Sequence, residues 1–193
     1  MFNKDTATST DNVAAGLVAK TGFSESAKAG GVFKVECVGA DGVVKWTDEM
    51  HNLVVNEGLQ DMNTQFFKGA TYTAAWYLGL VTGPGSSTTY AAADTLLTHG
   101  GWTEFTNYAG SRKAVTFGTA TTADPSVISN SASPSQFSIT GAGGTVAGAF
   151  LCSVASGTSG VLFSEADFQS PGDRVVVSGD TLNVTYTFSL DAA

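Results

Sequence analysis

Strict alternation of apolar and polar residues predicts a β-strand at the end of the chain, from Thr181 to Leu190. Its apolar positions are Leu182, Val184, Tyr186, Phe188 and Leu190, and the residues between them are Asn, Thr or Ser. This period of two is typical of a strand that buries one face and exposes the other. The segment 31–39 alternates in the same way and is expected to bury Phe33, Val35 and Cys37. Asp41-Gly42 then favours a tight hairpin, because both residues tolerate the backbone angles of such a turn.

A single helix interrupts the predicted strands. The run 53–55 predicts the end of one strand, and the almost wholly apolar segment 74–81 predicts a strand covered on both faces. Between them, over about residues 57–68, an apolar stripe at helical spacing contains Leu59, Met62, Phe66 and Phe67. We expect Asn56 to cap this helix and the stripe to close one open end of the core. Replacing a buried Phe66 by Ala would then lower the free energy of unfolding by about 3–5 kcal/mol.

The rest of the chain predicts short strands joined by turns rich in Gly, Ser and Asp. The segment 43–55 returns from the first hairpin, with its apolar pattern interrupted at residues 48–51. Further strands are expected at 102–108, 114–119, 136–140, 146–155, 160–164 and 174–178, with a helical turn within 91–99 and a long loop at 119–135. About nine short strands and one helix predict a mainly β fold. We expect one antiparallel β-sandwich domain, jelly-roll-like, over residues 31–193.

Residues 1–30 predict an extended N-terminal arm outside this domain. Their apolar residues are too sparse to build a core, although Val13, Leu17 and Val18 could share one face of a short helix. Two interpretations stay open: a frayed tail, or an arm that becomes ordered only against a neighbouring subunit. In the second case Val13, Leu17, Val18 and Phe23 bind the partner. Trp102, which follows Gly100-Gly101, is the tryptophan that we expect at an exposed surface or an interface.

A low content of charge and an acidic balance limit the possible partners. Only 13% of the residues are charged, and the net charge is −8. Nucleic-acid binding is not expected, because phosphate recognition needs a clustered basic surface. Membrane insertion is not expected either, since no stretch approaches the roughly 20 apolar residues of a membrane-spanning helix. The first residues lack a basic region followed by an apolar one, so we expect no signal peptide and synthesis in a cytoplasm.

The residue types that usually carry chemistry are few and scattered. Cys37 and Cys152 lie within apolar strand patterns, which favours buried thiols and leaves a disulfide as the alternative. The two histidines belong to no zinc-binding motif and to no nucleophilic triad. The acidic pairs Asp48-Glu49 and Glu165/Asp167 are interpreted as solvated turn residues. We therefore predict no enzyme, no catalytic residue, no metal site and no cofactor.

Three parts of the chain together resemble small virion proteins of tailed bacteriophages. They are Asn52–Leu59 with the following Phe66-Phe67, Trp76–Leu80, and Gly179–Leu190. The chain is most similar to capsid decoration, or cement, proteins with a jelly-roll-like β-sandwich, and the similarity covers about residues 31–190. It implies a non-enzymatic protein on the surface of the virion capsid, with the major capsid protein as its partner. Such a protein stabilises the shell by bridging subunits and acts as a symmetric homo-oligomer, a dimer or a trimer.

Two other functions remain as alternatives. The first is a tail or tail-fibre component, including a receptor-binding module that would hold host glycans with exposed aromatic side chains such as Trp102. The second is an enzyme, such as a depolymerase or wall hydrolase, whose paired carboxylates would be defined by a spatial separation that sequence spacing does not reveal. The position of the protein on the virion, and any turnover of capsule or peptidoglycan, would distinguish them.

Overall fold

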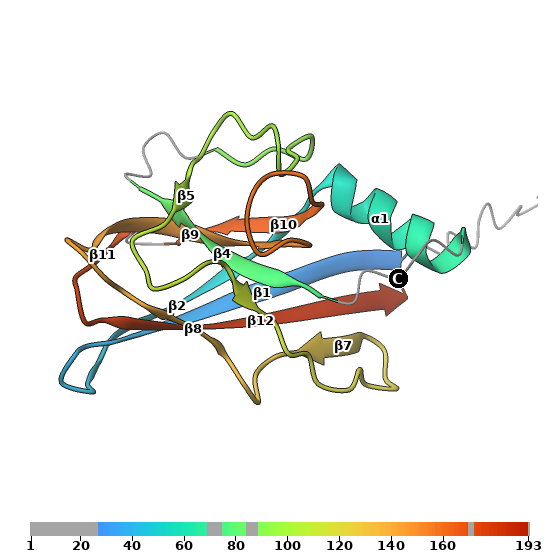
Figure 1. Ribbon diagram of the computed structural model, residues 1–193. Coiled ribbons are helices and arrows are strands. Elements are labelled where there is room, and N and C mark those ends of the chain that lie inside the picture. Colours follow the sequence, from blue (N-terminus) through green and yellow to red (C-terminus); the bar gives the residue numbers. More distant parts are fainter. Residues whose placement is uncertain (1–26, 69–74, 84–88, 170–171, 193) are drawn as a thin grey trace, which may run out of the picture.

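The computed structural model describes residues 27–68, 75–83, 89–169 and 172–192. This part of the chain folds as twelve strands and one helix (Figure 1). The strands are β1 (Ala27–Val38), β2 (Val44–His51), β3 (Leu53–Val54), β4 (Tyr77–Thr82), β5 (Glu104–Phe105), β6 (Lys113–Ala114), β7 (Ser126–Ser129), β8 (Ser135–Ser138), β9 (Gly144–Cys152), β10 (Leu162–Asp167), β11 (Arg174–Val176) and β12 (Thr181–Ala192), and the helix is α1 (Asn56–Phe67). The expected mainly β fold with one helix is confirmed.

The strands form two antiparallel sheets that pack face to face. The first sheet has five strands in the order β2-β1-β12-β7, with β8 also paired with β12. The second has seven strands in the order β3-β10-β9-β4-β5, with β11 paired with β9 and β6 with β4. Buried side chains from both sheets, such as Phe33 of β1 and Leu78 of β4, form one core between them. The β-sandwich is confirmed, whereas the strand order does not confirm the jelly-roll arrangement.

The long strands β1 and β12 form the centre of the first sheet. They pair along their whole length, from Ala27 opposite Ala192 to Val38 opposite Thr181. Six of the predicted inward residues are completely buried: Phe33, Val35, Cys37, Leu182, Val184 and Tyr186. Farther along β12, Phe188 is only partly buried and Leu190 is 36% exposed. The alternating face of β12 therefore continues beyond the closed core.

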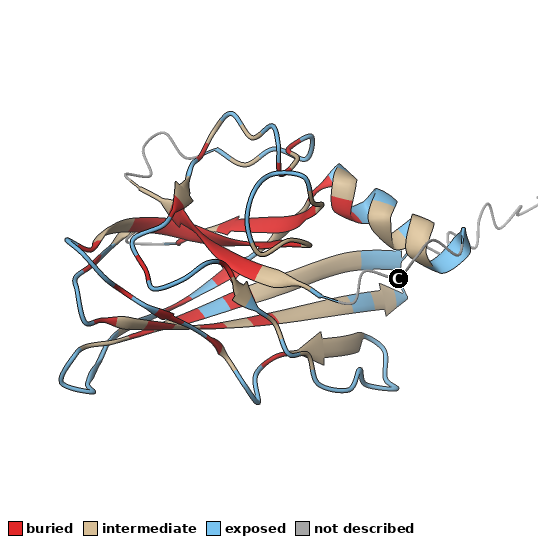
Figure 2. Cartoon of the chain, in the orientation of Figure 1, coloured by how far each residue is buried: buried red, intermediate tan, exposed pale blue. Residues whose placement is uncertain are grey.

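The second sheet is covered on both faces. Neighbouring residues of a strand point to opposite faces, so Leu80 lies in the core between the sheets while Val81 joins a second cluster on the outer face. Figure 2 shows the result as nearly continuous burial along β9, β10 and the middle of β4. This double burial accounts for the apolar, non-alternating sequence of β4, as expected from the sequence.

Trp102 belongs to the outer cluster, so the prediction that it is exposed is wrong. Its side chain is 6% exposed, and its indole Nε1 donates a hydrogen bond to Glu165 Oε2 at 2.9 Å. His99 stacks on the indole, with ring centroids 3.8 Å apart. Residues 91–99 form turns in place of the expected helical turn. The segment 89–103 thus covers the second sheet, because its largest side chain packs inward.

Several boundaries differ from those expected. The break in the strand that returns from the first hairpin falls at Asn52, because the chain leaves the first sheet there and joins the second as β3. The predicted strands at 102–108 and 114–119 shrink to β5 and β6, and the predicted loop at 119–135 contains β7. Val55 occupies the cap position of α1 without a side-chain hydrogen bond, so Asn56 is the first helical residue and not the cap.

The apolar stripe of α1 is not the buried clamp that its helical spacing predicted. Phe66 is 77% exposed and Phe67 is 85% exposed. Only Gly58, in the first turn, is buried, and the last turn extends beyond the sheets (Figures 1 and 2). Truncating an exposed side chain changes stability little. The expected loss of about 3–5 kcal/mol for Phe66→Ala is therefore wrong for the fold described.

Both cysteines are buried free thiols, as the sequence favoured. Burial, aided by the nearby Asp180 carboxylate, raises the pKa of Cys37 to about 11 and keeps this thiol protonated at neutral pH.

β1 begins at Ala27, four residues before the expected start of the domain. The predicted partner-binding residues of the arm, Val13, Leu17, Val18 and Phe23, lie outside the described residues. In the described ranges, α1 is too short and too polar to cross a membrane.

Candidate functional site

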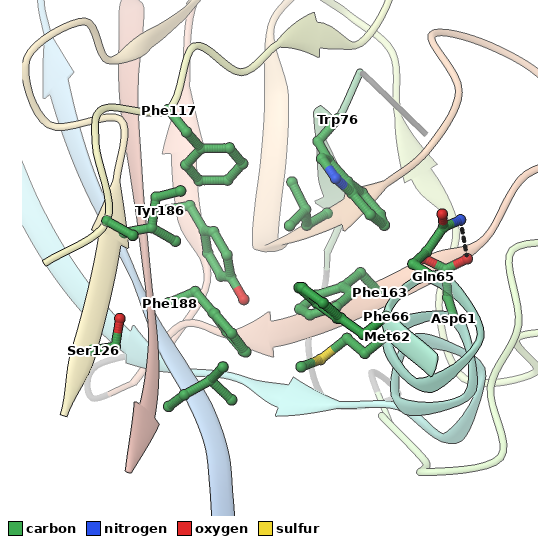
Figure 3. Close-up of a pocket in the computed structure, with 14 residues that line it drawn as sticks. Asp61, Met62, Gln65, Phe66, Trp76, Phe117, Ser126, Phe163, Tyr186 and Phe188 are labelled. Carbon is green, nitrogen blue, oxygen red and sulfur yellow. Dashed lines mark hydrogen bonds between the residues drawn. The ribbon is translucent and has the colours of Figure 1, made fainter. Parts of the chain in front are cut away.

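An apolar groove opens between the two sheets at the end where α1 lies (Figure 3). Its volume is about 360 Å³, within the range of roughly 300–1,000 Å³ found for small-molecule sites. The side chains come from α1, from four strands and from neighbouring loops. They are Asp61, Met62, Gln65, Phe66, Trp76, Phe117, Ala120, Ser126, Ile128, Leu151, Phe163, Tyr186, Phe188 and Leu190. Apolar and aromatic groups dominate, so this apolar groove is the candidate binding site.

Aromatic rings fix much of the groove wall. Trp76 meets Phe163 with ring centroids 5.3 Å apart, and Phe163 meets Phe188 at 5.4 Å, both in edge-to-face geometry. Such contacts are favourable because the positive edge of one ring faces the negative face of the other. The rings come from both sheets and from the segment before β4, as Figure 3 shows. The groove therefore presents a preformed apolar surface.

Tyr186 contributes its ring to the groove and no free hydroxyl group. Its Oη accepts hydrogen bonds from Asn52 Nδ2 at 2.9 Å and from Ser164 Oγ at 3.2 Å. Burial raises the pKa of Tyr186, so the phenol stays neutral. The strand corner at Asn52 and the floor of the groove are thus linked by one hydrogen bond. Tyr186 therefore supports the floor of the groove and offers no free nucleophile there.

Two polar side chains of the groove, Asp61 and Gln65, lie on α1. Gln65 Nε2 donates a hydrogen bond to Asp61 Oδ1 at 3.3 Å, which joins two side chains one turn apart on the helix. Met62, between them in sequence, supplies a flexible apolar group on the same wall. The arrangement favours burial of an apolar group across the strands, with polar contacts available along the helix.

The first turn of α1 holds the helix against the second sheet. Glu57 Oε2 accepts hydrogen bonds from the backbone N–H of Leu162 at 2.8 Å and of Leu96 at 3.3 Å. Gly58 lies so close to β10 that an added Cβ would stand 2.4 Å from the carbonyl oxygen of Phe163. A side chain at this position has no room, so the glycine sets the distance between the helix and the groove.

Gly58→Ala should separate α1 from β10 and lower the free energy of unfolding by about 1–3 kcal/mol, because the contacted atoms are backbone and cannot move aside alone. Urea unfolding followed by tryptophan fluorescence measures the loss, and Trp76 in the groove should report the altered wall. Gly100→Ala is the matched control, since its added Cβ would meet no atom within 4 Å. Equal stability of the two variants would contradict this account of the helix position.

The acidic pairs are not simply the solvated turn residues that the sequence suggested. Asp48 is 9% exposed and forms an ion pair with Arg174, and Glu165 is completely buried beside Asp94. Asp94 is itself 9% exposed, so this carboxyl pair is largely covered in the fold described. Among the described residues, no group of three or more His, Cys, Asp or Glu side chains is arranged to hold a metal ion.

The groove was not identified from the sequence, and the predicted site residue Trp102 lies elsewhere, on the outer face of the second sheet. The available signal was the continued alternation of Phe188 and Leu190, which places apolar residues on the inward face of β12 beyond the core. Comparison with known proteins adds no further assignment: no protein-family model, no curated protein and no solved structure matches the chain.

Proposed function

We propose that this protein is a non-enzymatic structural subunit of a phage virion, which binds the outside of the capsid and bridges major capsid protein subunits. The packing motifs that resemble decoration proteins suggest this role. The structural observation that supports it is an exposed apolar surface at the end of the sandwich opposite α1. We call it the valine surface; it consists of Val43, Val44, Val175 and Val177, which are 60%, 48%, 66% and 48% exposed.

Asp180 joins the two segments that form the valine surface. Its Oδ2 accepts hydrogen bonds from Lys45 Nζ at 2.8 Å and from the backbone N–H of Val177 at 3.0 Å. The turn between β1 and β2 therefore lies beside the segment that follows β11, and both are far from α1 in Figure 1. Asp180 is 2% exposed, so its contacts hold the two segments firmly together.

The valine surface has the properties of a protein-binding site. Neighbouring exposed apolar side chains, rimmed by polar groups, commonly mark such sites on soluble proteins. Among the described strands β11 pairs with β9 alone, so a strand of a partner would add to its other edge. The net charge of −8 would favour approach to a basic surface of the partner. These features suit attachment to a large protein shell, and the proposal includes a symmetric homo-oligomer as the attached form.

The double variant Val175→Asp/Val177→Asp should weaken binding to capsids by about tenfold or more, because two charges would be buried at the interface. Both side chains are exposed, so the fold should remain intact. Cosedimentation with capsids that lack the protein measures the affinity, and imaging of the decorated particles locates the copies.

Leu97→Asp is the matched control, because Leu97 is 74% exposed and belongs to the segment over the second sheet. It should bind like the wild type. Wild-type affinity of the double variant, or wild-type copies on the tail and none on the shell, would overturn the proposal. The glycan-binding alternative relied on Trp102 as an exposed ring for stacking on a sugar. The Trp102 side chain is buried and offers no such face.

A further inference from the structure

We propose that the N-terminal segment of the same chain occupies the apolar groove, with Val13, Leu17, Val18 and Phe23 against its aromatic wall. The inference rests on the groove and on the place where the described chain begins, and it is independent of the proposed role in a virion. The occupant is thus an intramolecular ligand, and the groove is its docking site.

The described part of the chain begins at the rim of the groove. β1 starts at Ala27, and Ala29 pairs with Leu190, whose side chain lines the groove. On its other side Leu190 pairs with Ser126, a further lining residue. Figure 1 shows the start of β1, the end of β12 and the last turn of α1 at one end of the molecule. The N-terminal segment is therefore joined to the fold beside the groove.

The length of the preceding chain fits this placement. Phe23 lies four residues before Ala27, a span of at most about 14 Å in an extended chain. Leu17 lies ten residues before Ala27 and reaches at most about 36 Å. Both distances suffice to bring the side chains across a groove that starts at the neighbouring strand pair. Short tethers of this kind give an effective concentration on the order of millimolar, which favours the chain's own segment over that of a second copy.

The chemistry of the segment matches that of the groove. The stretch 12–19 contains no charged residue, so its burial would leave no unpaired charge in apolar surroundings. Val13, Leu17 and Val18 have the spacing of residues that share one helix face. The groove offers them partly exposed rings and aliphatic groups from both sheets, and Phe66 stands 77% exposed on its helical wall. Burial of these groups against one another supplies the driving force.

A spin label on the full-length protein tests the placement. Ala19→Cys introduces a labelling site next to Val18 without removing a proposed contact. The native Cys37 and Cys152 are completely buried, which protects them from the reagent. The amide NMR signals of Ile128 and Leu190 should broaden, whereas those of Val175 and Val177 at the opposite end should not. Adding Leu17→Asp and Val18→Asp to the labelled chain should abolish the broadening.

Mixing distinguishes an intramolecular from an intermolecular occupant. Spin-labelled chains without ¹⁵N are combined with unlabelled ¹⁵N chains, and the signals of the groove should then stay sharp. Broadening in this mixture would assign the groove to the arm of a second copy and overturn the proposal. Absence of broadening at the groove in the singly labelled protein would overturn it as well.

Binding of the apolar dye 8-anilinonaphthalene-1-sulfonate provides a second measurement on full-length protein. Leu17→Asp/Val18→Asp should increase the dye fluorescence several-fold, because the groove would lose its occupant and admit the dye. Thr6→Asp/Thr8→Asp adds the same charge to the same segment and should leave the fluorescence at the wild-type level. Strong dye binding by the wild type, unchanged in the Leu17→Asp/Val18→Asp variant, would indicate a groove open to small apolar ligands and contradict the proposal.

Discussion

Arg112→Ala should lower the free energy of unfolding by about 3–5 kcal/mol, the range expected when one partner of a buried ion pair is removed. Arg112 is 7% exposed although it carries a full charge. Its Nε and Nη2 donate hydrogen bonds to the two carboxylate oxygens of Glu104 at 2.9 and 2.8 Å. This bidentate geometry gives strong, directional hydrogen bonds. Removing the guanidinium leaves the Glu104 carboxylate without its cation.

The same guanidinium also closes the loop that follows β9. Its Nη1 donates to the carbonyl oxygen of Gly157 at 3.0 Å and to that of Val154 at 3.3 Å. The charged group lies over the ring of Phe150, 5.1 Å from the centroid. Arg112→Ala therefore removes the hydrogen-bond donor of these two carbonyl groups and the cation over the Phe150 ring. A buried acceptor without a donor costs stability beyond the loss of the bond itself.

Urea unfolding of a double-mutant cycle separates these contributions. Glu104→Gln alone should cost less than Arg112→Ala, because Glu104 is 25% exposed and the guanidinium keeps its carbonyl partners. Arg112→Ala combined with Glu104→Gln should be less destabilised than the sum of the single variants, since no lone carboxylate remains. Full additivity, or a loss below about 1 kcal/mol for Arg112→Ala, would show that solvent already screens the pair.

The strands with one buried face were the most predictable part of the fold. Alternation in β1 and β12 identified inward residues such as Val35 and Val184, because burial of one face imposes a period of two on the sequence. The apolar run of β4 predicted burial on both faces for the same reason. These signals are local, because the apolar pattern within a strand depends on whether one or both of its own faces are buried.

The contacts between distant segments could not be predicted in this way. Trp102 follows two glycines, which suggested exposure, yet its partner Glu165 lies 63 residues farther along the chain. The stripe of α1 predicted a helix at the right place, but helical spacing does not say what lies opposite a helix face. Phe66 is exposed because the sheets end before the last turn of the helix reaches them.

The groove illustrates the same limit. Phe188 alternates in β12 as regularly as Val184, and both were predicted to face inward. Val184 lies where the two sheets meet, whereas Phe188 lies where they leave a cavity. Alternation in one strand predicts which of its residues face inward. It does not predict where the opposite sheet ends. Identifying the groove therefore required the arrangement of both sheets and of α1.

The stability of the protein should decrease as the pH rises from about 5 to about 8, and Glu165→Gln should remove most of this decrease. Burial, with a contribution from the neighbouring Asp94 carboxylate, raises the pKa of Glu165 to about 8. In the unfolded chain the same carboxyl group titrates near its ordinary pKa of about 4.3. Between these values the folded protein holds a proton that the unfolded chain has released, so each rise in pH favours unfolding.

The hydrogen bonds around Glu165 explain why the protonated form suits the folded protein. Trp102 Nε1 donates to Oε2, while Oε1 has no donor among the described residues. A proton on the carboxyl group can be donated towards Asp94, which converts a repulsion between two buried carboxylates into a hydrogen bond. Stabilisation from Glu165 is then complete below about pH 4 and is lost as the pH passes through about 8.

The expected change is about 1.4 kcal/mol for each pH unit at its steepest, from this group alone. The Gln side chain in Glu165→Gln is neutral at every pH and keeps an oxygen that can accept the Trp102 hydrogen bond. The free energy of unfolding of this variant should therefore match that of the wild type near pH 5 and exceed it by about 2–4 kcal/mol at pH 8. Urea unfolding at pH 5, 6, 7 and 8 measures both curves. Glu49→Gln, at an exposed position of β2, should follow the wild type. Parallel curves for Glu165→Gln and the wild type would mean that the buried carboxyl group ionises without cost to stability, and would contradict its raised pKa.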